Sequence, residues 1–472
     1  MKKLESEAAA AVRIGATMAR RQRDALLGVL RPCFARTSPW LQAGKYLAAV
    51  MSELPKRNGW TVARHAGDRS PDRMQRLLNR AAWDAPAAMG VVRRFAVAGL
   101  DGAAGRGGRR RGLAIGALDE TGQEKQGELT AGVKRQHLGC AGRVANGIST
   151  VHLSYVRERT GHALIGFRQW IPAAHIDDPV KSLLMGLPPD LAFRTKGQLA
   201  IDICAEALDG GVAVDFFCGD EVYGNCTQLR EFFGARGQGY VLRVPSSFRF
   251  TLASGVRLTC AGAVRKLLKD GRRWETRSAG KGSKGDRWYA RALIGTASPG
   301  HCLLIRRHLK AGELAFHYCY VPAGQQLSMT RLIRAAGLRW PVEEGSEFAR
   351  DHFGLDQSQV RLCTAITRCT VLVMAALAIC AITAATLRDR TDSQAPPPVR
   401  PGQPPPAGPG MIPLTVPAIK RLLAAMTTRD HPSGHAEHWE CWTRRHQARS
   451  RWFHQRTRLE RDQEITLNPL VI

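Results

Sequence analysis

The pattern of apolar residues changes near residue 112, and this change constrains the fold more than any other feature of the sequence. Up to about residue 100, apolar side chains recur every three or four positions, as they do on one face of a helix. After the glycine- and arginine-rich segment 102–112, strand-like segments come first and strand–helix units follow. This order predicts an α/β protein with a mixed sheet, preceded by a helical region. The strand-like segments are LAIGALDE, ISTVHLSYV and HALIGFRQWI.

Charge and composition narrow the function. The chain has 69 Lys and Arg against 40 Asp and Glu, a net charge of +29, which favours a polyanionic partner such as nucleic acid over a basic surface kept for solubility. A hydrophobic fraction of 44% and a mean hydropathy of −0.23 exclude a wholly disordered chain and a polytopic membrane protein. The twelve cysteines include no CxxC pair, and we expect buried, reduced thiols in a reducing cytosol.

One uncharged segment, residues 369–387, has about the length that spans a bilayer. Its content of Ala, Thr and Cys and the arginines close to both ends are equally typical of a helix buried on all sides. We expect the buried helix and no membrane partner.

Two basic segments have the residue types of DNA contacts. Residues 58–84 have a helix-turn-helix outline, in which Ser70 caps a second helix that begins at Pro71; an ordinary pair of amphipathic helices would look the same. Residues 444–461 contain seven arginines and one acid, interleaved with Trp452 and Phe453, which favours nucleic-acid contact over an ordinary charged tail. The candidate DNA-binding residues here are Arg73, Arg76 and Arg80 on the second helix, and Arg444 and Arg445 in the tail.

Three acids stand out by their context. Asp119 and Asp220 each end a long apolar run, and Glu343 lies near the start of a helix that we expect from Trp340. Two aspartates at the ends of central strands, approached by a glutamate, form an all-oxygen pocket of the kind that Mg²⁺ prefers. Two such ions, about 3.5–4 Å apart, can activate the attacking oxygen and stabilise the leaving one in phosphodiester chemistry.

The helix around Glu343 has a face suited to DNA. Glu343, Glu347 and Arg350 follow at i, i+4 and i+7, while Glu344 is turned about 100° away. This face would present a carboxylate to metal and a guanidinium to a phosphate. A solvent-exposed Glu–Arg helix has the same pattern.

Several strings together resemble a known family. The chain resembles bacterial insertion-sequence transposases of the DDE superfamily, in the insertion-sequence seven-hundred-and-one branch, and the matching strings span most of its length in the family's order. They are NGW, AGD, MQRLLNRAAWD, LDETGQEKQG, GVKRQHLGCAGRVANG, GDEVYG, LRW with V-EE, GLDQSQVR, PLTVPAIKRLL and WTRRHQAR.

The resemblance implies an RNase H-like catalytic domain with a β-strand insertion before the glutamate. Asp119, Asp220 and Glu343 would be the catalytic residues and would hold two Mg²⁺ (or Mn²⁺) ions. Water would hydrolyse a strand at the transposon end, and the freed 3′-hydroxyl would attack target DNA in line.

The family signature around the glutamate matches this chain in part. Arg339 and Glu343 match, Arg350 stands at the lysine position, and Ala336 replaces the tyrosine, which puts one contact with end DNA in question. Lys134 and Arg135, in the basic segment KRQH, are further candidates for DNA contact.

The first acid is ambiguous in the same way. Family members often have Asp-Asp-Thr where this chain has Asp119, Glu120 and Thr121. We expect Asp119 to be the ligand; if it were the second acid, the glutamate there would weaken this copy.

The predicted fold and the predicted roles together divide the chain into six segments. They are a helical DNA-binding domain (1–100), the first part of the catalytic domain (110–244), a β-rich insertion (245–328), the last part of the catalytic domain with the glutamate helix (329–390), a proline-rich linker (391–411) and a basic helical C-terminal tail that contacts DNA (412–472).

The sequence thus predicts a metal-dependent DNA transposase, an endonuclease and strand transferase. Its partners would be double-stranded DNA, as inverted-repeat ends and as target, and a second copy of the chain on the paired ends. It would act in the bacterial cytoplasm, at the nucleoid. The alternative is a catalytically weakened or domesticated copy that binds DNA without cutting it; a general nuclease without end preference ranks last because of the long basic flanks.

Overall fold

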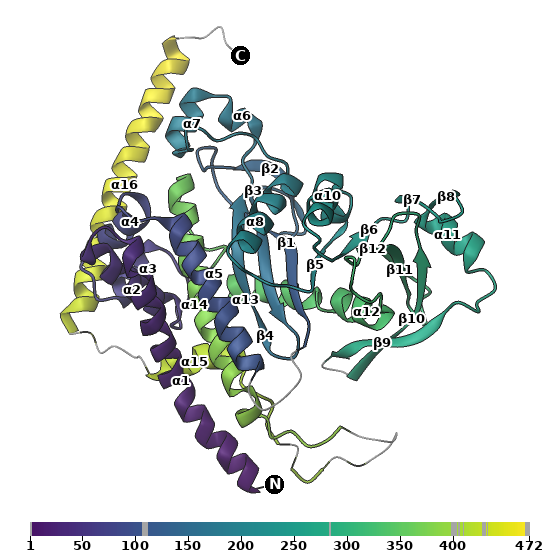
Figure 1. Ribbon diagram of the computed structural model, residues 1–472. Coiled ribbons are helices and arrows are strands. Elements are labelled where there is room, and N and C mark those ends of the chain that lie inside the picture. Colours follow the sequence, from purple (N-terminus) through teal and green to yellow (C-terminus); the bar gives the residue numbers. More distant parts are fainter. Residues whose placement is uncertain are drawn as a thin grey trace.

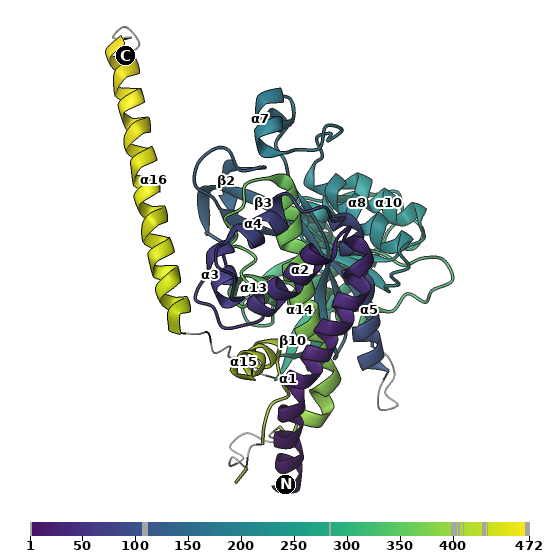
Figure 2. The ribbon, with the colours of Figure 1, turned by 90° about the vertical axis from the view of Figure 1, so that its left-hand side faces the viewer.

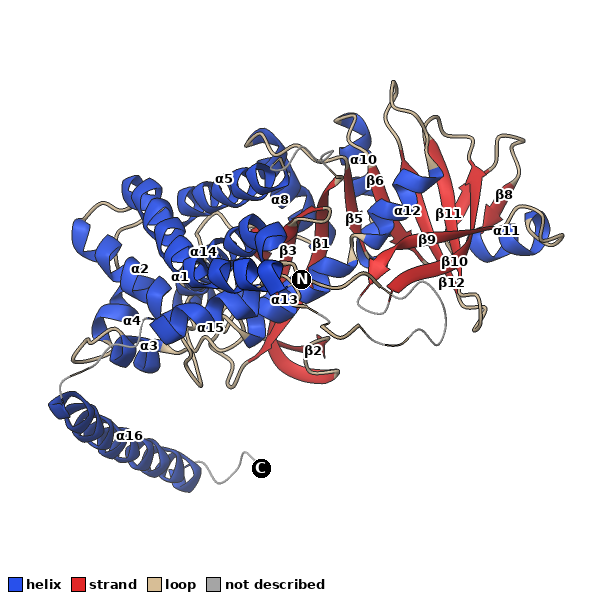
Figure 3. Ribbon diagram, turned by 90° about the horizontal axis from the view of Figure 1, so that it is seen from below, coloured by secondary structure: helices blue, strands red, loops and turns tan. Residues whose placement is uncertain are grey.

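A mixed sheet runs through the whole molecule, and helices pack on both of its faces (Figures 1 and 3). The computed structural model describes residues 2–105, 112–282, 285–397, 404, 406–408, 410–426, 431 and 433–467. The strand order is β2-β3-β1-β5-β6-β12-β11-β10-β9, and β4 also pairs with β3. The strands are β1 (Ala114–Glu124), β2 (Lys134–Leu138), β3 (Arg143–Arg157), β4 (Gly161–Gln169), β5 (Phe216–Gly219), β6 (Tyr240–Val244), β9 (Glu275–Gly282), β10 (Gly285–Gly295), β11 (His301–Arg307) and β12 (Leu314–Tyr320).

The first half of the sheet has the predicted RNase H-like arrangement. Strands β1, β3 and β4 form an antiparallel meander, and β5 and β6 then join the other side of β1 in parallel. Helices lie between β4 and β5 and between β5 and β6, as parallel connections require. The predicted α/β fold class is therefore confirmed.

The segment after β6 extends the same sheet. Strand β12 pairs antiparallel with β6, and β11, β10 and β9 follow in order. A separate hairpin of β7 (Arg249–Thr251) and β8 (Arg257–Thr259) leads into a helix, α11 (Cys260–Leu267), so the segment predicted as β-rich also contains helix. These strands and α11 enclose a small core of their own, with Phe250, Ile305 and Phe316.

The two faces of the sheet have different covers. Helices α5, α14, α8 and α10 pack on one face, which we call the inner face, and share its apolar core with Leu118, Leu153 and Phe217. Helices α12 and α13 lie on the other, which we call the outer face; there α12 packs on Ala117 and Cys218. The helices of these layers are α5 (Ala85–Ala104), α6 (Ala173–Ile176), α7 (Pro179–Met185), α8 (Lys196–Asp209), α9 (Glu221–Gly224), α10 (Thr227–Ala235), α12 (Met329–Gly337), α13 (Trp340–Asp351) and α14 (Cys363–Thr391).

Helix α14 is the centre of the helical layer. By length and composition it could cross a membrane, but 89% of its most apolar window is buried inside the protein, as its apolar surface on all sides predicts. It packs against α5, α2 and β4. The N-terminal helices around it are α1 (Lys2–Leu30), the 3₁₀ turn Arg31–Cys33, α2 (Thr37–Val50), α3 (Gly59–His65) and α4 (Asp72–Asn79).

The C-terminal segment is made of two unlike parts. Helix α15 (Val416–Met426) packs against α1 and α14, and Lys420 on it is buried and pairs with Glu53 at 2.9 Å, so this helix belongs to the core and not to a tail. Helix α16 (Ser433–Leu467) runs beside the helical layer and then beyond it (Figure 2). Residues 398–403, 405 and 409 of the predicted linker, and 106–111 of the glycine-rich segment, lie outside the described residues.

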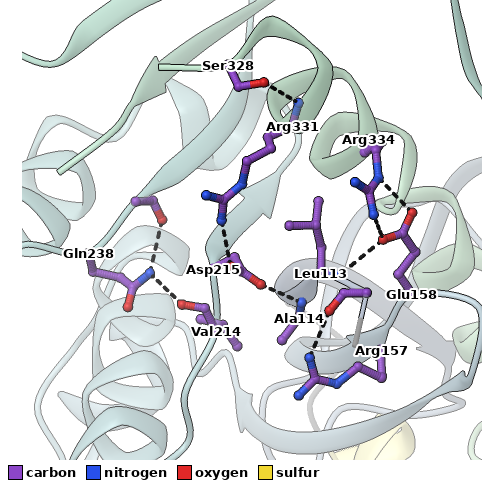
Figure 4. A network of polar contacts seen from close by, with 12 residues as sticks. Leu113, Ala114, Arg157, Glu158, Val214, Asp215, Gln238, Ser328, Arg331 and Arg334 are labelled. Atoms are coloured by element: carbon purple, nitrogen blue, oxygen red, sulfur yellow. Dashed lines mark hydrogen bonds and ion pairs between the residues drawn. The ribbon is translucent and has the colours of Figure 1, made fainter. Parts of the chain in front are cut away.

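Polar contacts at the base of the sheet fix α12, the helix that leads into the glutamate helix (Figure 4). Arg331 donates to Asp215 at 2.8 Å, and Asp215 accepts a second hydrogen bond from the backbone N–H of Ala114, the first residue of β1. Arg334 donates in the same way to Glu158, at 2.9 Å, just after β3. These ion pairs hold α12 against residues that flank β3 and β5, and only two residues separate the end of α12 from the start of α13.

Candidate active site

Asp119 and Asp220 occupy equivalent places on two neighbouring parallel strands. Strands β1 and β5 pair as far as Ala117 and Cys218, and each aspartate lies two residues further along. Paired residues of adjacent strands point to the same face, so both carboxylates lie on the outer face. Asp220 also caps α9, since its Oδ1 accepts a hydrogen bond from the backbone N–H of Val222 at 2.9 Å.

Glu343 reaches the same face from α13. It lies in the first turn of this helix, which packs against β1, β3 and β4. Its Oε1 accepts a hydrogen bond from Nη2 of Arg339 at 2.5 Å, and its side chain is 41% exposed. The same guanidinium is close enough to Asp119 to act on that carboxyl electrostatically.

The three acids share one electrostatic environment. Burial raises the pKa of Asp119 to about 6, and the neighbouring carboxylates of Asp220 and Glu343 raise it as well. The backbone N–H of Glu120 and the Arg339 guanidinium act in the opposite direction. Residues 119, 220 and 343, which are far apart in the sequence, therefore come together in the fold.

The acids do not form a complete metal cage as they stand. Within the described part of the chain, no group of three or more His, Cys, Asp or Glu side chains is arranged to hold a metal ion. Glu343 is instead engaged by Arg339. A metal site at these acids would need the Glu343 carboxylate to exchange this partner for the cation.

Glu120 points away from the site. Side chains alternate along a strand, so it lies on the inner face, opposite to Asp119. There its Oε2 accepts a charge-assisted hydrogen bond from Lys196 at the start of α8, and its Oε1 is buried without a partner. The pleat of β1 therefore favours Asp119 as the acid of this pair that faces Asp220.

The turn that carries Asp220 is held very close to β6. A Cβ atom on Gly224, the last residue of α9, would lie 1.7 Å from the carbonyl oxygen of Arg243, so only glycine allows this approach. The preceding Tyr223 is fully buried, and its hydroxyl has no hydrogen-bond partner. Burial and then the carboxylates of Glu120, Asp220 and Asp119 raise the pKa of this phenol, which stays neutral behind the acids.

The basic residues predicted near the acids have different surroundings. Arg350, in the last turn of α13, donates to Oγ1 of Thr121 at 3.2 Å, so it lies beside β1 two residues beyond Asp119. Lys134 and Arg135 lie on β2 at the edge of the sheet, and both are exposed. Ala336, which replaces the tyrosine of the signature, packs against the apolar cluster of the outer face.

The arginines predicted on the second helix of the helix-turn-helix outline are exposed. Arg73 and Arg76 lie on α4 and Arg80 is its C-cap. The predicted cap is wrong by one position: Pro71 is the N-cap residue, and the Ser70 hydroxyl accepts a hydrogen bond from the backbone N–H of Asp72 at 3.4 Å.

The start of α16 packs on the turn between α3 and α4. Trp439 is 2% exposed and its Nε1–H donates to the carbonyl of Asp68 at 3.0 Å. The ring of Trp442 meets that of Trp60 on α3 edge to face at 4.5 Å. Arg444 and Arg445 follow on the same helix and are exposed. The two basic segments predicted at opposite ends of the sequence therefore adjoin in space.

A comparison with known protein families concerns the part of the chain that carries the two aspartates. Residues 29–260 match the family described as DDE superfamily endonuclease. The match covers just under half of the chain, and we call these residues the DDE segment. The DDE segment contains Asp119 and Asp220 but ends before Glu343, and nothing in the match distinguishes the insertion-sequence seven-hundred-and-one branch, which stays a prediction.

Other comparisons add little. No curated protein matches the chain. Among solved structures, piggyBac transposase in a cryo-EM synaptic complex with hairpin DNA aligns with a TM-score of 0.33 and 10% identity, over 80% of this chain and 66% of that one. The chain thus spans slightly less than two thirds of the piggyBac chain, and a TM-score this low carries no conclusion.

Sequence reasoning missed several residues of the DDE segment and its surroundings. The Glu120–Lys196 pair and Tyr223 were not predicted, although strict alternation along β1 already places residues 119 and 120 on opposite faces. The basic residues on β6, β10, β11 and β12 were also missed, because they are single arginines and histidines without a shared motif.

Proposed function

We propose that this chain is a DNA transposase that cleaves the ends of an insertion sequence by hydrolysis and joins the freed 3′-hydroxyl to target DNA. The observation that carries the proposal is the pairing of Asp119 with Asp220 on the outer face, inside the DDE segment, with Glu343 in electrostatic reach. The net charge of +29 and the exposed arginines of α4 and α16 support double-stranded DNA as the partner.

The donor chemistry fits Mg²⁺ or Mn²⁺. Three carboxylates that converge without a cation repel one another, and the raised pKa of Asp119 records this repulsion together with burial. Hard divalent cations prefer such oxygen ligands, and Asp119, Asp220 and Glu343 would hold them. When bound, two ions would activate the attacking oxygen and stabilise the leaving one.

The protein's own groups position the DNA. When Glu343 turns to the aspartates, the guanidinium of Arg339 becomes available for a bidentate contact with a phosphate beside the acids. Arg350, held against Thr121, would contact a phosphate one step further along β1. Holding the phosphate and the attacking hydroxyl in line provides most of what such a reaction needs from a protein.

A second candidate is a DNA-binding protein that does not cut. The observation that favours it is the ion pair of Glu343 with Arg339, which leaves the described residues without a group of three metal-ligating side chains. Glu120 does not favour it, because this residue faces away from the acids.

End cleavage tests the proposal. The full-length protein is incubated with a duplex that joins the element's terminal inverted repeat, read from the DNA that flanks the gene, to its flank. We expect nicks at the junction with Mg²⁺ or Mn²⁺, none in EDTA and none on a duplex with a scrambled repeat. Joined products with a plasmid would show strand transfer, and a homodimer on paired ends would appear as a two-end complex in a gel.

The outcomes separate the candidates. Binding specific to the repeat without cleavage under any divalent cation would refute the enzyme and support the binding protein. Cleavage of any duplex at the same rate would refute both and indicate a general nuclease.

A further inference from the structure

A row of basic side chains lies on the outer face of the sheet, on the strands that follow β5 in the order β6-β12-β11-β10. His317 on β12 pairs with Arg243 on β6. Arg306 on β11 pairs with Arg291 on β10. His317 also pairs with Leu304, two residues before Arg306, so all four basic side chains point to one face. We call Arg243, His317, Arg306 and Arg291 the basic row.

The basic row continues the line of the acids. Cys218 pairs with Val241, and Asp220 and Arg243 each lie two residues further along, so they are neighbours on the same face. From β1 to β12, the order across the sheet is therefore Asp119, Asp220, Arg243 and His317. Arg339 acts electrostatically on Asp119 and on His317, which also places the two sets of charges together.

Arg291, Arg306 and His317, the members of the basic row furthest from the acids, have no acidic partner among the described residues. Arg291 is 2% exposed, and its Nε is buried without a hydrogen bond. Nε of Arg306 and Nδ1 of His317 are also buried without a hydrogen bond. Among the described residues, which omit 283–284 before β10, no carboxylate lies within 4 Å of the charged groups of Arg291 or Arg306. Only Arg243 has an acid partner, Glu221 at 3.1 Å.

An aromatic ring is the main neighbour of these guanidinium groups. Arg291 lies over Tyr289 at 5.1 Å from the ring centroid and Arg306 at 4.9 Å. A cation–π contact compensates only a small part of the cost of burying a charge without a partner. Burial first and then neighbouring Arg306 lower the pKa of Arg291 to about 10. Like charges have thus been brought together where nothing in the described chain neutralises them.

We propose that the basic row binds the phosphates of a DNA strand that continues from the acids. Arg306, His317 and Arg243 are partly exposed and would contact the strand, while buried Arg291 adds charge from behind. Arginine suits phosphate because its planar group makes two parallel hydrogen bonds. This inference rests on DNA as the substrate of the proposed function and assigns which part of the protein holds the strand next to the cut.

The spacing of the strands gives the distance between the acids and Arg306. From β5 to β11 there are three strand spacings, about 14 Å in total. At about 3.4 Å per phosphate along one strand of a duplex, Arg306 would contact a phosphate roughly four nucleotides from the scissile one.

Neighbouring arginines provide a matched test. Arg306 faces the basic row, and Arg307 points to the other face, over the ring of Trp274 at 4.2 Å. The full-length R306Q and R307Q variants are compared with the wild type for binding of a fluorescein-labelled 30-base-pair DNA duplex, in EDTA, over a range of salt concentrations. R306K serves as the conservative variant, and a thermal melt followed by circular dichroism checks that each variant is folded.

We expect R306Q to bind about ten-fold more weakly, with the slope of log affinity against log salt reduced by about 0.9, the value for one lost phosphate contact. R307Q should keep the wild-type slope and R306K should restore it. Equal slopes for R306Q and R307Q would overturn the proposal, and so would tighter, equally arginine-dependent binding of an RNA duplex of the same length.

Binding in EDTA does not depend on cleavage. If the wild type fails to cut but R306Q loses the phosphate contact, the proposed enzyme is refuted and the basic row stands. If the wild type cuts and R306Q binds DNA as the wild type does, the basic row is refuted and the proposed enzyme stands.

Discussion

The two halves of the sheet hold like charges together, but of opposite sign. On the RNase H-like half, Asp119, Asp220 and Glu343 share one environment, and the pKa of Asp119 is raised. On the half built after β5, Arg291 and Arg306 lie together, and the pKa of Arg291 is lowered. Each half costs folding free energy through desolvation and repulsion, and the described residues offset this cost only in part, through Arg339 beside the acids and Glu221 beside Arg243.

This contrast points to two ligands bound side by side, one of each charge. A cation at the acids and a phosphodiester strand across the arginines would neutralise each cluster, and the shared outer face makes a continuous path between them. The two halves should therefore separate in experiment: substitutions among the acids should remove cleavage, and substitutions in the basic row should weaken binding.

The largest effect is expected from the acids. We predict that Asp119→Asn, and independently Asp220→Asn, lowers the rate of end cleavage by more than about 10³-fold, since each removes a charged ligand from the proposed metal site. The affinity for end DNA in EDTA should stay the same or rise, because a negative charge beside the phosphates is lost. Cleavage and binding are measured on the same duplex. A variant that keeps a tenth of the wild-type rate would show that its aspartate is not a ligand.

The basic half should have its own pH dependence. Burial first and then the nearby arginines lower the pKa of His317 from its ordinary value near 6.5 to about 3. The unfolded chain therefore binds a proton below pH 6.5 that the folded protein refuses, and stability is lost as the pH falls from about 6.5 towards 3. Between pH 7 and pH 5 this one residue should cost about 2 kcal/mol.

We predict that His317→Gln lessens the loss of stability between pH 7 and pH 5, measured from urea unfolding at both values. The wild type should lose more than the variant because it keeps His317. Both proteins should still lose some stability, because burial lowers the pKa values of His152 and His162 to about 4. Exposed His137 on β2 provides the control substitution. A His317→Gln variant with the wild-type pH dependence would show that this imidazole is not kept neutral by the basic row.

The acidic half was accessible from the sequence because local patterns mark it. Asp119 and Asp220 each end an apolar run, and Glu343 follows the proline in the first turn of α13. The predicted position at a strand end is right for Asp220, which directly follows β5, and wrong for Asp119, because β1 continues to Glu124. The fold class followed from the switch between helical and strand periodicity, and the buried α14 from its apolar surface on all sides. Such signals need only a few neighbouring residues.

The basic half was not accessible, because the register of antiparallel strands decides it. Nothing in the local sequence distinguishes Arg306 from Arg307, yet one faces the basic row and the other a separate core. Burial of Lys420 on α15 was missed for a similar reason, since its partner Glu53 lies 367 residues away. Long-range pairing, and not composition, makes these sites.

The smallest effect should come from the residue next to Asp119, and it gives the sharpest check on the geometry of β1. Glu120→Gln keeps the size of the side chain and removes only its charge, on the face opposite to the acids, where it pairs with Lys196. That pair is partly exposed, so its loss should change the free energy of unfolding by about 1 kcal/mol or less. End cleavage should stay within about three-fold of the wild-type rate, since Asp119 and Asp220 keep their places on the outer face. Should Glu120→Gln remove cleavage while Asp119→Asn preserves it, the pleat of β1 would have to be reversed, and the basic row, whose facing depends on the same register, would lose its connection to the site.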